Sequence, residues 1–241
     1  MRGHIDMNQI FFVIPAYNES FVISSVVRAV QKLCSNIIVV DDGSDDDTFS
    51  EAKSAGAEVL RHIVNRGQGA ALATGVLYSL SKGAEIIVTF DADGQHDPSQ
   101  INELIEPILQ KKTDVVLGSR FLDSKLKTQN LHNVIPFTRL IILKLALLHQ
   151  WFFTGLKVTD THCGLRAFSR KAAEKITITQ DRMAHASEIL EEIARHRLSF
   201  IEVPVRVRYT AYSLEKGQRS FTGSIRILYD FFVGRFLNVK R

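Results

Sequence analysis

The chain has 241 residues, of which 45% are hydrophobic and 23% charged, a composition typical of a globular protein with a full core. This length fits one large α/β domain, or one domain with an appendage. The net charge is +4, and most Lys and Arg residues lie from Lys111 onward, which fits a half that meets phosphate or an anionic membrane surface. No basic run interleaved with aromatic residues occurs, which argues against nucleic acid as a partner.

The first 120 residues alternate between strand and helix patterns. Apolar runs predict strands at 10–14, 37–41, 57–62, 85–90 and 114–118, and helical patterns lie near 19–33, 47–55, 69–81 and 98–111. Alternation at this spacing predicts an α/β fold, with a mostly parallel sheet between layers of helices.

Beyond residue 120 the regular alternation ends. Residues 122–133 predict a mobile loop, and residues 134–156 are very apolar. Arg139 and Lys144 argue against a membrane span, because a central Arg or Lys costs roughly 2.5–3.5 kcal/mol on insertion scales. We therefore expect a helix that lies in the membrane interface or packs on the sheet.

The last part of the chain predicts a helix at 184–196, a strand at 199–208 and a C-terminal helix. Apolar residues recur from Phe221 to Phe236 at spacings of three and four, flanked by basic residues. This face packs on the protein's own core or attaches to a membrane surface, and its width favours the membrane. We expect a domain at 1–220 and an amphipathic helix at 221–241.

The two cysteines, Cys34 and Cys163, lie far apart and form no metal-spaced pair. They indicate a reducing compartment without a disulfide framework. We expect Cys163 to be a small packing residue rather than a nucleophile. Residues 1–9 contain no apolar core of the kind that a signal peptide needs.

Two carboxylates, Asp91 and Asp93, directly follow the expected strand at 85–90. Mg²⁺ and Mn²⁺ typically bind one or two carboxylates and complete their shell with phosphate oxygens. The small residue between them, Ala92, lets a bulky diphosphate approach. Such an acidic pair occurs often by chance, and its position after a buried strand is what favours a cation site.

Two other expected strands also end in polar turns, Pro15–Glu19 and Asp41–Asp45. In a parallel sheet these ends share the edge where the ligand crevice lies. Helix capping accounts for Asp46 or Asp47, but not for the doubled acid at the strand end. We therefore expect Asp42 to contact a ligand.

Six motifs occur in order along the chain: Val13–Glu19, Val40–Ser44, Asn65–Ala71, Phe90–His96, Gly118–Phe121 and Asp160–Arg166. In this order and spacing they resemble family 2 glycosyltransferases with the GT-A fold, and among them the polyprenyl-phosphate (dolichyl- or undecaprenyl-phosphate) sugar synthases. The match covers about residues 8–220. It implies an inverting, metal-dependent transfer of a sugar from a nucleotide diphosphate to polyprenyl phosphate.

The resemblance also implies residues for the donor and its cation. Those matching the nucleotide-binding motifs are Pro15, Ala16, Tyr17, Glu19, Asp42, Gly69, Asp91 and Ala92. Asp93 and Gln95 would hold Mg²⁺ or Mn²⁺ against the diphosphate, and Asp91 and Asp93 are the implied catalytic residues. The cation would offset charge on the departing nucleotide diphosphate.

For the acceptor, Arg120 and Arg139 match arginines that grip the lipid phosphate in such enzymes, a task that suits guanidinium. The alternative for Arg139 is snorkelling from an amphipathic helix. Since a phosphate acceptor is already ionised, no general base is needed. A sugar-hydroxyl acceptor would need one, and Glu188 is the candidate.

A basic loop follows the expected last strand. Ser213 and Lys216 would form a lid over the donor diphosphate, with Arg208 or Arg206 substituting for an arginine that is displaced relative to close relatives. The alternative is a solvated basic loop.

The implied partners are a nucleotide diphosphate sugar, with UDP favoured over GDP-mannose, a polyprenyl-phosphate lipid and a membrane surface. The implied location is peripheral, on the cytoplasmic face of the cell membrane, and a homo-oligomer is compatible with the sequence. Two alternatives are a transferase that acts on a saccharide hydroxyl in surface glycan assembly and a non-catalytic nucleotide-sugar-binding subunit.

Overall fold

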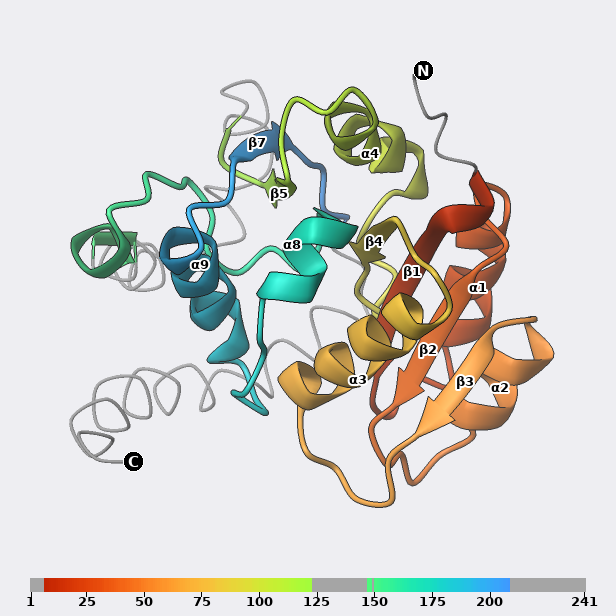
Figure 1. Cartoon of the computed structure of the whole chain (residues 1–241). Helices are drawn as coiled ribbons and strands as arrows, with labels where there is room; N and C mark the ends of the chain where they lie inside the picture. Colours follow the sequence, from red (N-terminus) through yellow and green to blue (C-terminus); the bar gives the residue numbers. More distant parts are fainter. Residues whose placement is uncertain (1–6, 123–146, 149, 209–241) are drawn as a thin grey trace. The chain divides into compact units, whose positions relative to one another are not determined.

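The computed structural model of the protein describes residues 7–122, 147–148 and 150–208 (Figure 1). The chain divides into two compact units, 1–207 and 208–241, and every element named below belongs to the first. Arg139, Ser213, Lys216 and the expected C-terminal helix at 221–241 lie outside the described residues.

A mixed sheet of seven strands, in the order β3-β2-β1-β4-β6-β5-β7, forms the centre of the first unit. The strands are β1 (Ile10–Ala16), β2 (Ile37–Asp41), β3 (Glu58–Arg61), β4 (Ile86–Thr89), β5 (Val115–Ser119), β6 (Arg166–Ser169) and β7 (Phe200–Pro204). β6 is antiparallel to both of its neighbours, and the other pairs are parallel. The predicted mostly parallel α/β sheet is confirmed.

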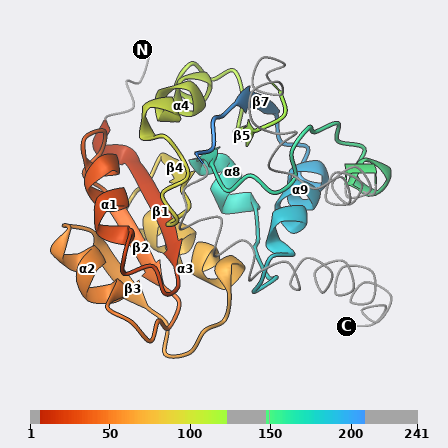
Figure 2. The same ribbon diagram turned by 180° about the vertical axis from the view of Figure 1, so that it is seen from behind.

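Helices cover both faces of this sheet (Figures 1 and 2). On one face lie α1 (Ile23–Gln31), α2 (Thr48–Ser54) and α4 (Ile101–Leu109), and on the other lie α3 (Gln68–Ser81), α8 (Arg170–Lys175) and α9 (His185–Arg195). Short 3-10 turns, η1 (Met7–Gln9) and η2 (Pro98–Gln100), precede β1 and α4.

The two faces have separate apolar cores because side chains alternate along each strand. In β1, Ile10, Phe12 and Ile14 pack in the core that contains α1 and α4. Phe11 and Val13 pack in the core that contains α3 and α9. A strand buried on both faces is an unbroken apolar run in the sequence, which is why these strands were predictable.

Two predicted helices begin differently in the structure. The helix expected near 19–33 begins at Ile23, because the preceding residues form a turn in which Asn18 has a positive φ of 53°. The helix expected at 98–111 begins as the 3-10 turn η2, where the side chain of Asp97 caps the N–H of Ser99 at 3.0 Å. Pro98 occupies the first turn, where the missing N–H costs nothing.

The second half of the sheet departs further from expectation. β6 and α8 were not predicted, and β7 ends at Pro204, several residues before the expected end at 208. β6 has only four residues, and its first, Arg166, is buried. A short strand with a buried cation lacks the apolar pattern that identifies the other strands.

The apolar stretch expected at 134–156 is described only at its end. Residues 147–148 and 150–154 are helical, and Leu148, Trp151, Phe152 and Phe153 are exposed. Within the described residues, no helix is long and apolar enough to cross a membrane. A helix in the membrane interface therefore stays a prediction.

Candidate functional site

The carboxyl ends of β1, β2 and β4 meet at one edge of the sheet, where β1 lies between the other two strands. Chain order reverses between β1 and β4, and ligand crevices of parallel sheets open at such switch points. The N–H of Asp42 donates to the carbonyl of Ala16 at 2.8 Å, and that of Phe90 to the carbonyl of Val13 at 3.0 Å. The strand pairing thus reaches both acidic turns.

The turns after β1 and β2 are joined by hydrogen bonds. The N–H of Asn18 donates to Ser44 Oγ at 2.9 Å, and the Asn18 side chain accepts from the N–H of Asp45 at 3.0 Å. The N–H of Glu19 donates to Thr48 Oγ1 at 2.8 Å. The two motifs, which are far apart in the sequence, therefore form one surface.

The residues predicted to hold the nucleotide differ in accessibility. Pro15 and Ala16 are the last two residues of β1 and are buried, as are Glu19 and Ala92. Tyr17 is 40% exposed at the mouth of the sheet. Among these, the ring of Tyr17 is the side chain best placed to touch a nucleoside.

Asp42 is buried and holds the loop before α3. Its Oδ1 lies 2.7 Å from His62 Nδ1 and accepts the N–H of Arg66 at 3.1 Å, and its Oδ2 accepts the N–H of Gly67 at 2.6 Å. On the other side of the ring, His62 Nε2 lies 2.9 Å from Thr74 Oγ1. Asp42 thus organises the loop, and its contact with the nucleotide stays a prediction.

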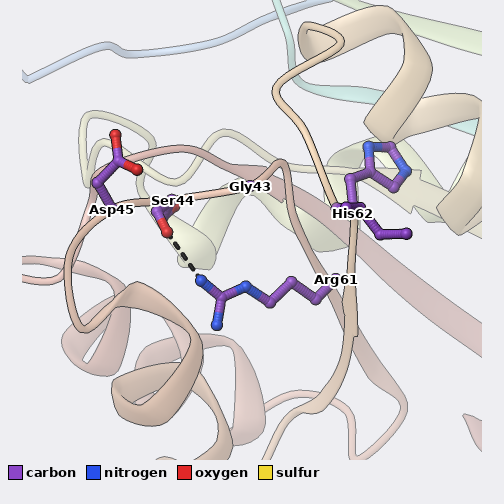
Figure 3. Close-up of a pocket in the computed structure, with 6 residues that line it drawn as sticks. Gly43, Ser44, Asp45, Arg61 and His62 are labelled. Atoms are coloured by element: carbon purple, nitrogen blue, oxygen red, sulfur yellow. Dashed lines mark hydrogen bonds between the residues drawn. The ribbon is translucent and has the colours of Figure 1, made fainter.

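An open hollow of about 340 Å³ lies beside this turn, lined by Gly43, Ser44, Asp45, Arg61, His62 and Ile63 (Figure 3). The guanidinium of Arg61 crosses it and donates to the carbonyl of Ser44 at 2.9 Å. Gly43 has a φ of +73°, and a Cβ there would lie 2.9 Å from backbone atoms of the next loop. The hollow depends on this close approach of two loops.

The glycines at the start of α3 allow a distant segment to pack against them. A Cβ on Gly67 would lie 2.5 Å from the carbonyl oxygen of Asp181, and one on Gly69 would overlap the carbonyl of Gln180. The N–H of Ala70 donates to the same Asp181 carbonyl at 3.1 Å. Glycine at both positions therefore lets residues 180–182 pack directly against the start of α3.

Asp91 is held from three sides. Gln68 Nε2 donates to its Oδ1 at 3.0 Å, and His96 Nε2 lies 3.0 Å from its Oδ2. The backbone of Gly164 passes so close that a Cβ there would overlap the carboxylate. Burial by itself would raise the pKa of Asp91, but the hydrogen bond and charge of His96, with the charge of Arg166, lower it.

Asp93 has a different environment. Its Oδ1 accepts the N–H of Gln95 at 3.0 Å, across a turn in which Gly94 has a φ of +71°. Burial first, and then the negative charge of Asp91, raise the pKa of Asp93 to about 6. A divalent cation beside these carboxylates would relieve their repulsion.

The residues present fit a cation that takes most of its ligands from a substrate. Within the described part of the chain, no group of three or more His, Cys, Asp or Glu side chains could hold a metal ion. Asp93, with Gln95, offers one carboxylate and one amide oxygen. This small oxygen set suits Mg²⁺ or Mn²⁺ bound together with phosphate oxygens.

Arg120 follows β5 and forms a bidentate ion pair with Asp160. Its Nε donates to Asp160 Oδ2 at 2.7 Å, and its Nη2 donates to Oδ1 at 2.9 Å. Burial opposes ionisation of Asp160, but the charge of Arg120 prevails and lowers its pKa. The side chain of Arg120 is 22% exposed, and its predicted contact with an acceptor phosphate stays a prediction.

Three residues remain to be described. Arg208 is exposed and is the last described residue. Glu188, in the first turn of α9, accepts hydrogen bonds from the N–H groups of Thr179 and Gln180, each at 2.9 Å. Cys163 is buried, which raises its pKa to about 12, so the expectation of a packing residue is confirmed.

Sequence reasoning missed several residues of this site. Gln68 lies inside a quoted motif, but nothing local shows that it reaches Asp91. Arg166 is buried and donates to the carbonyls of Cys163 and Thr161, both at 3.0 Å. His185, at the start of α9, has a pKa that burial first, and then the charge of Arg166, lower to about 4.

Comparison with known proteins identifies a family and several relatives. The model of the family described as Glycosyl transferase family 2 matches residues 11–177. The chain is 35% identical to UDP-N-acetylglucosamine–dolichyl-phosphate N-acetylglucosaminyltransferase of Methanococcus voltae, over 91% of this chain and 93% of the relative. It is 31% identical to polyprenol monophosphomannose synthase of Mycolicibacterium smegmatis, over 88% of this chain and 80% of the relative.

Among solved structures, the fold is similar to glucosyl-3-phosphoglycerate synthase from Mycobacterium tuberculosis in complex with Mn²⁺, UDP-glucose and phosphoglyceric acid. The TM-score is 0.63 at 20% identity, covering 84% of this chain and 72% of that one. This likeness concerns the fold alone and confirms the predicted GT-A architecture.

Proposed function

The chain belongs to glycosyltransferase family 2, and we propose that it is an inverting enzyme that transfers a sugar from a nucleotide diphosphate to polyprenyl phosphate. The observation that carries the proposal is the pair Asp91 and Asp93 at the end of β4, beside the turns that follow β1 and β2. Ligands of parallel sheets bind at such switch points, and carboxylates fixed there can bind the cation that accompanies the diphosphate of a nucleotide sugar.

The relatives support the choice of donor and acceptor. The Methanococcus voltae protein is named for UDP-N-acetylglucosamine and dolichyl phosphate, and it matches nearly the whole chain. The Mycolicibacterium smegmatis protein is named for polyprenol and mannose. The higher identity to the first relative favours a UDP-sugar over GDP-mannose as the donor.

At the donor end, Tyr17 would contact the nucleoside, while Asp93 and Gln95 would hold Mg²⁺ or Mn²⁺. When bound, the cation would supply charge stabilisation to the departing nucleotide diphosphate. Asp91 would orient the sugar, since its carboxylate is already held by Gln68 and His96. Such prior orientation lowers the cost of positioning in the transition state.

At the acceptor end, Arg120 would contact the lipid phosphate, with Arg139 as a second cation. A phosphate oxygen would attack the anomeric carbon as the bond to the nucleotide diphosphate breaks, and the configuration at that carbon inverts. A phosphate acceptor is ionised at neutral pH, so no side chain has to remove a proton. The hydrogen bonds of Glu188 to Thr179 and Gln180 fit this proposal, since its carboxylate already serves a turn.

A lipid acceptor requires a membrane near the site. Leu148, Trp151, Phe152 and Phe153 expose between 48% and 74% of their surface. Aromatic side chains of this kind favour the membrane–water interface, where one side is apolar and the other wet. We therefore propose peripheral attachment at the cytoplasmic face through this segment.

The test is transfer of label from radioactive nucleotide sugars to undecaprenyl phosphate, with and without Mn²⁺. We expect organic-extractable label only with the metal, and none with Asp93→Asn, which should keep its fold in circular dichroism. Label that moves only to soluble saccharides would favour a hydroxyl acceptor instead. Transfer that continues undiminished after removal of all divalent ions would refute the role assigned to Asp93.

A further inference from the structure

We propose that Glu202, on β7, is a positioning residue for the acceptor: it anchors the Thr159–Asp160 turn and through that turn fixes Arg120. The inference rests on the proposed function, because it assigns Arg120 to the acceptor phosphate. Glu202 was not among the residues predicted from the sequence.

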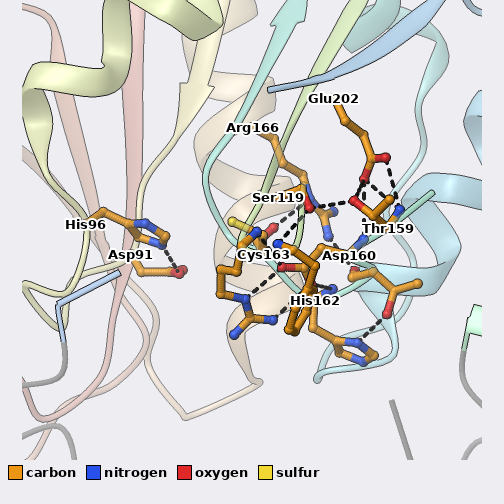
Figure 4. A network of polar contacts seen from close by, with 12 residues as sticks. Asp91, His96, Ser119, Thr159, Asp160, His162, Cys163, Arg166 and Glu202 are labelled. Carbon is orange, nitrogen blue, oxygen red and sulfur yellow. Dashed lines mark hydrogen bonds and ion pairs between the residues drawn. The ribbon is translucent and has the colours of Figure 1, made fainter. Parts of the chain in front are cut away.

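The carboxylate of Glu202 binds two successive residues of the loop before β6 (Figure 4). The N–H of Thr159 donates to its Oε1 at 2.8 Å and to its Oε2 at 3.0 Å. Thr159 Oγ1 donates to Oε1 at 3.0 Å, and the N–H of Asp160 donates to the same oxygen at 3.3 Å. One side chain thus fixes the backbone of a segment that has no regular secondary structure.

Asp160 connects this turn to the guanidinium of Arg120. Asp160 is buried and accepts hydrogen bonds from Arg120 Nε, Nη2 and N–H, the last at 3.2 Å. It also accepts the N–H of His162 at 3.1 Å. The orientation of the Arg120 guanidinium therefore depends on the position of the Asp160 carboxylate. Because Glu202 sets the backbone of Asp160, it also sets the geometry of Arg120.

A second tie reinforces the same turn. Ser119 Oγ lies 2.6 Å from Thr159 Oγ1 and accepts the N–H of Phe121 at 3.1 Å. Ser119 is the last residue of β5, directly before Arg120, and β5 pairs with β7. The end of β5 is thus joined to the turn twice, through Ser119 to Thr159 and through Arg120 to Asp160.

A negative charge on Glu202 costs free energy at this position, and a residue that only holds the turn would not need it. Burial, together with the nearby charge of Asp160, raises the pKa of Glu202 against the effect of its hydrogen bonds from Thr159. A neutral acceptor would hold the turn without placing a second carboxylate beside Asp160. The carboxylate nevertheless has a second acceptor oxygen, Oε2, which takes a further hydrogen bond from the N–H of Thr159 at 3.0 Å and so fixes the angle of the turn.

The same strands offer a matched control at their other end. Asp114 lies just before β5, and Ser199 lies just before β7. The carboxylate of Asp114 accepts hydrogen bonds from Ser199 Oγ at 2.8 Å and from Lys171 Nζ at 3.0 Å. This is also a carboxylate that joins the β5 and β7 segments, but it lies at the opposite end of β5 from Arg120. A general weakening of the β5–β7 pair would affect both positions alike.

The experiment measures steady-state transfer with the full chain, varying undecaprenyl phosphate and the nucleotide sugar separately. Glu202→Gln keeps the size of the side chain, but its NH₂ group at the Oε2 position cannot accept the N–H of Thr159. We expect the KM for undecaprenyl phosphate to rise about tenfold or more, the change that one charged hydrogen bond supports. The KM for the nucleotide sugar should change by less than about twofold, and Asp114→Asn should change neither value.

Several outcomes would overturn the inference. One is a folded Glu202→Gln enzyme whose KM for undecaprenyl phosphate is unchanged. Another is an equal rise of this KM in Glu202→Gln and in Asp114→Asn. If Glu202→Gln does not fold, Glu202→Asp shortens the side chain by one methylene and withdraws the carboxylate from the turn, and an unchanged acceptor KM in that folded variant is equally decisive. A wild-type protein that transfers nothing to the lipid would refute the proposed function itself and this inference with it.

Discussion

Replacement of Gly164 by alanine is expected to disable transfer while the fold persists. A Cβ at this position would overlap the Asp91 carboxylate, which would have to leave its hydrogen bonds with Gln68 and His96, both 3.0 Å long. A hydrogen bond to a charged group contributes about 1.5–3 kcal/mol, so two such losses weaken the placement of Asp91 by about 3–6 kcal/mol before relaxation. Relaxation recovers part of this energy. Since about 1.4 kcal/mol is tenfold in rate, we expect kcat to fall about 100-fold or more.

The assay compares kcat and the melting temperature of Gly164→Ala with those of Gly83→Ala. Gly83 has a φ of +88°, and a Cβ there would meet nothing within 4 Å. The control therefore carries backbone strain of about 1–2 kcal/mol without approaching the site. We expect the control to lower the melting temperature and leave kcat unchanged. A folded Gly164→Ala enzyme that transfers sugar at the wild-type rate would show that Asp91 need not keep this position.

Three further predictions follow from burial and charge. Asp160→Asn should destabilise the fold by about 3 kcal/mol in urea at neutral pH, because the buried partner of Arg120 is lost. Because the pKa of Asp160 is lowered in the fold, its contribution is present above the ordinary pKa of an Asp and is lost as the pH falls. The difference in stability between the wild type and the variant should therefore shrink in acid, and a difference that does not change with pH would contradict this. Cys163, whose pKa is raised to about 12, should react with iodoacetamide at pH 8 only after unfolding, as mass spectrometry of labelled peptides would show. His185, with a pKa lowered to about 4, should stay neutral at pH 6 in NMR titration. Its burial should cost stability as the pH falls from about 6.5 toward 4, a loss that His185→Gln should reduce.

The parts of the fold that were predictable are those set by local pattern. β1, β2 and β4 are buried on both faces, so their sequences are continuous apolar runs of strand length. The start of η2 was predictable because Asp97 and Pro98 are a cap and a first-turn residue in sequence. β6 was not, because its four residues are identified as a strand only by their pairing with β4 and β5.

The candidate site shows the same division. The motifs identified the chemical groups, but the partners that orient them lie far along the chain. Asp91 is held by Gln68, 23 residues earlier, and Thr159 by Glu202, 43 residues later. Contacts at these separations depend on the crossovers of the sheet and leave no periodic signal in the sequence. Gly69 is similar, since the carbonyl that excludes a side chain there belongs to Gln180.

The carboxylates of the site differ in how their charge is met. Asp42, Asp91 and Asp160 each accept hydrogen bonds from a side chain, namely His62, Gln68 and Arg120. For Asp93, the donor that the described residues supply is the N–H of Gln95, and its pKa is raised to about 6. The first three are therefore oriented by the protein itself. Asp93 retains unmet negative charge next to Asp91, and a cation delivered with a diphosphate would neutralise that charge where the leaving group departs.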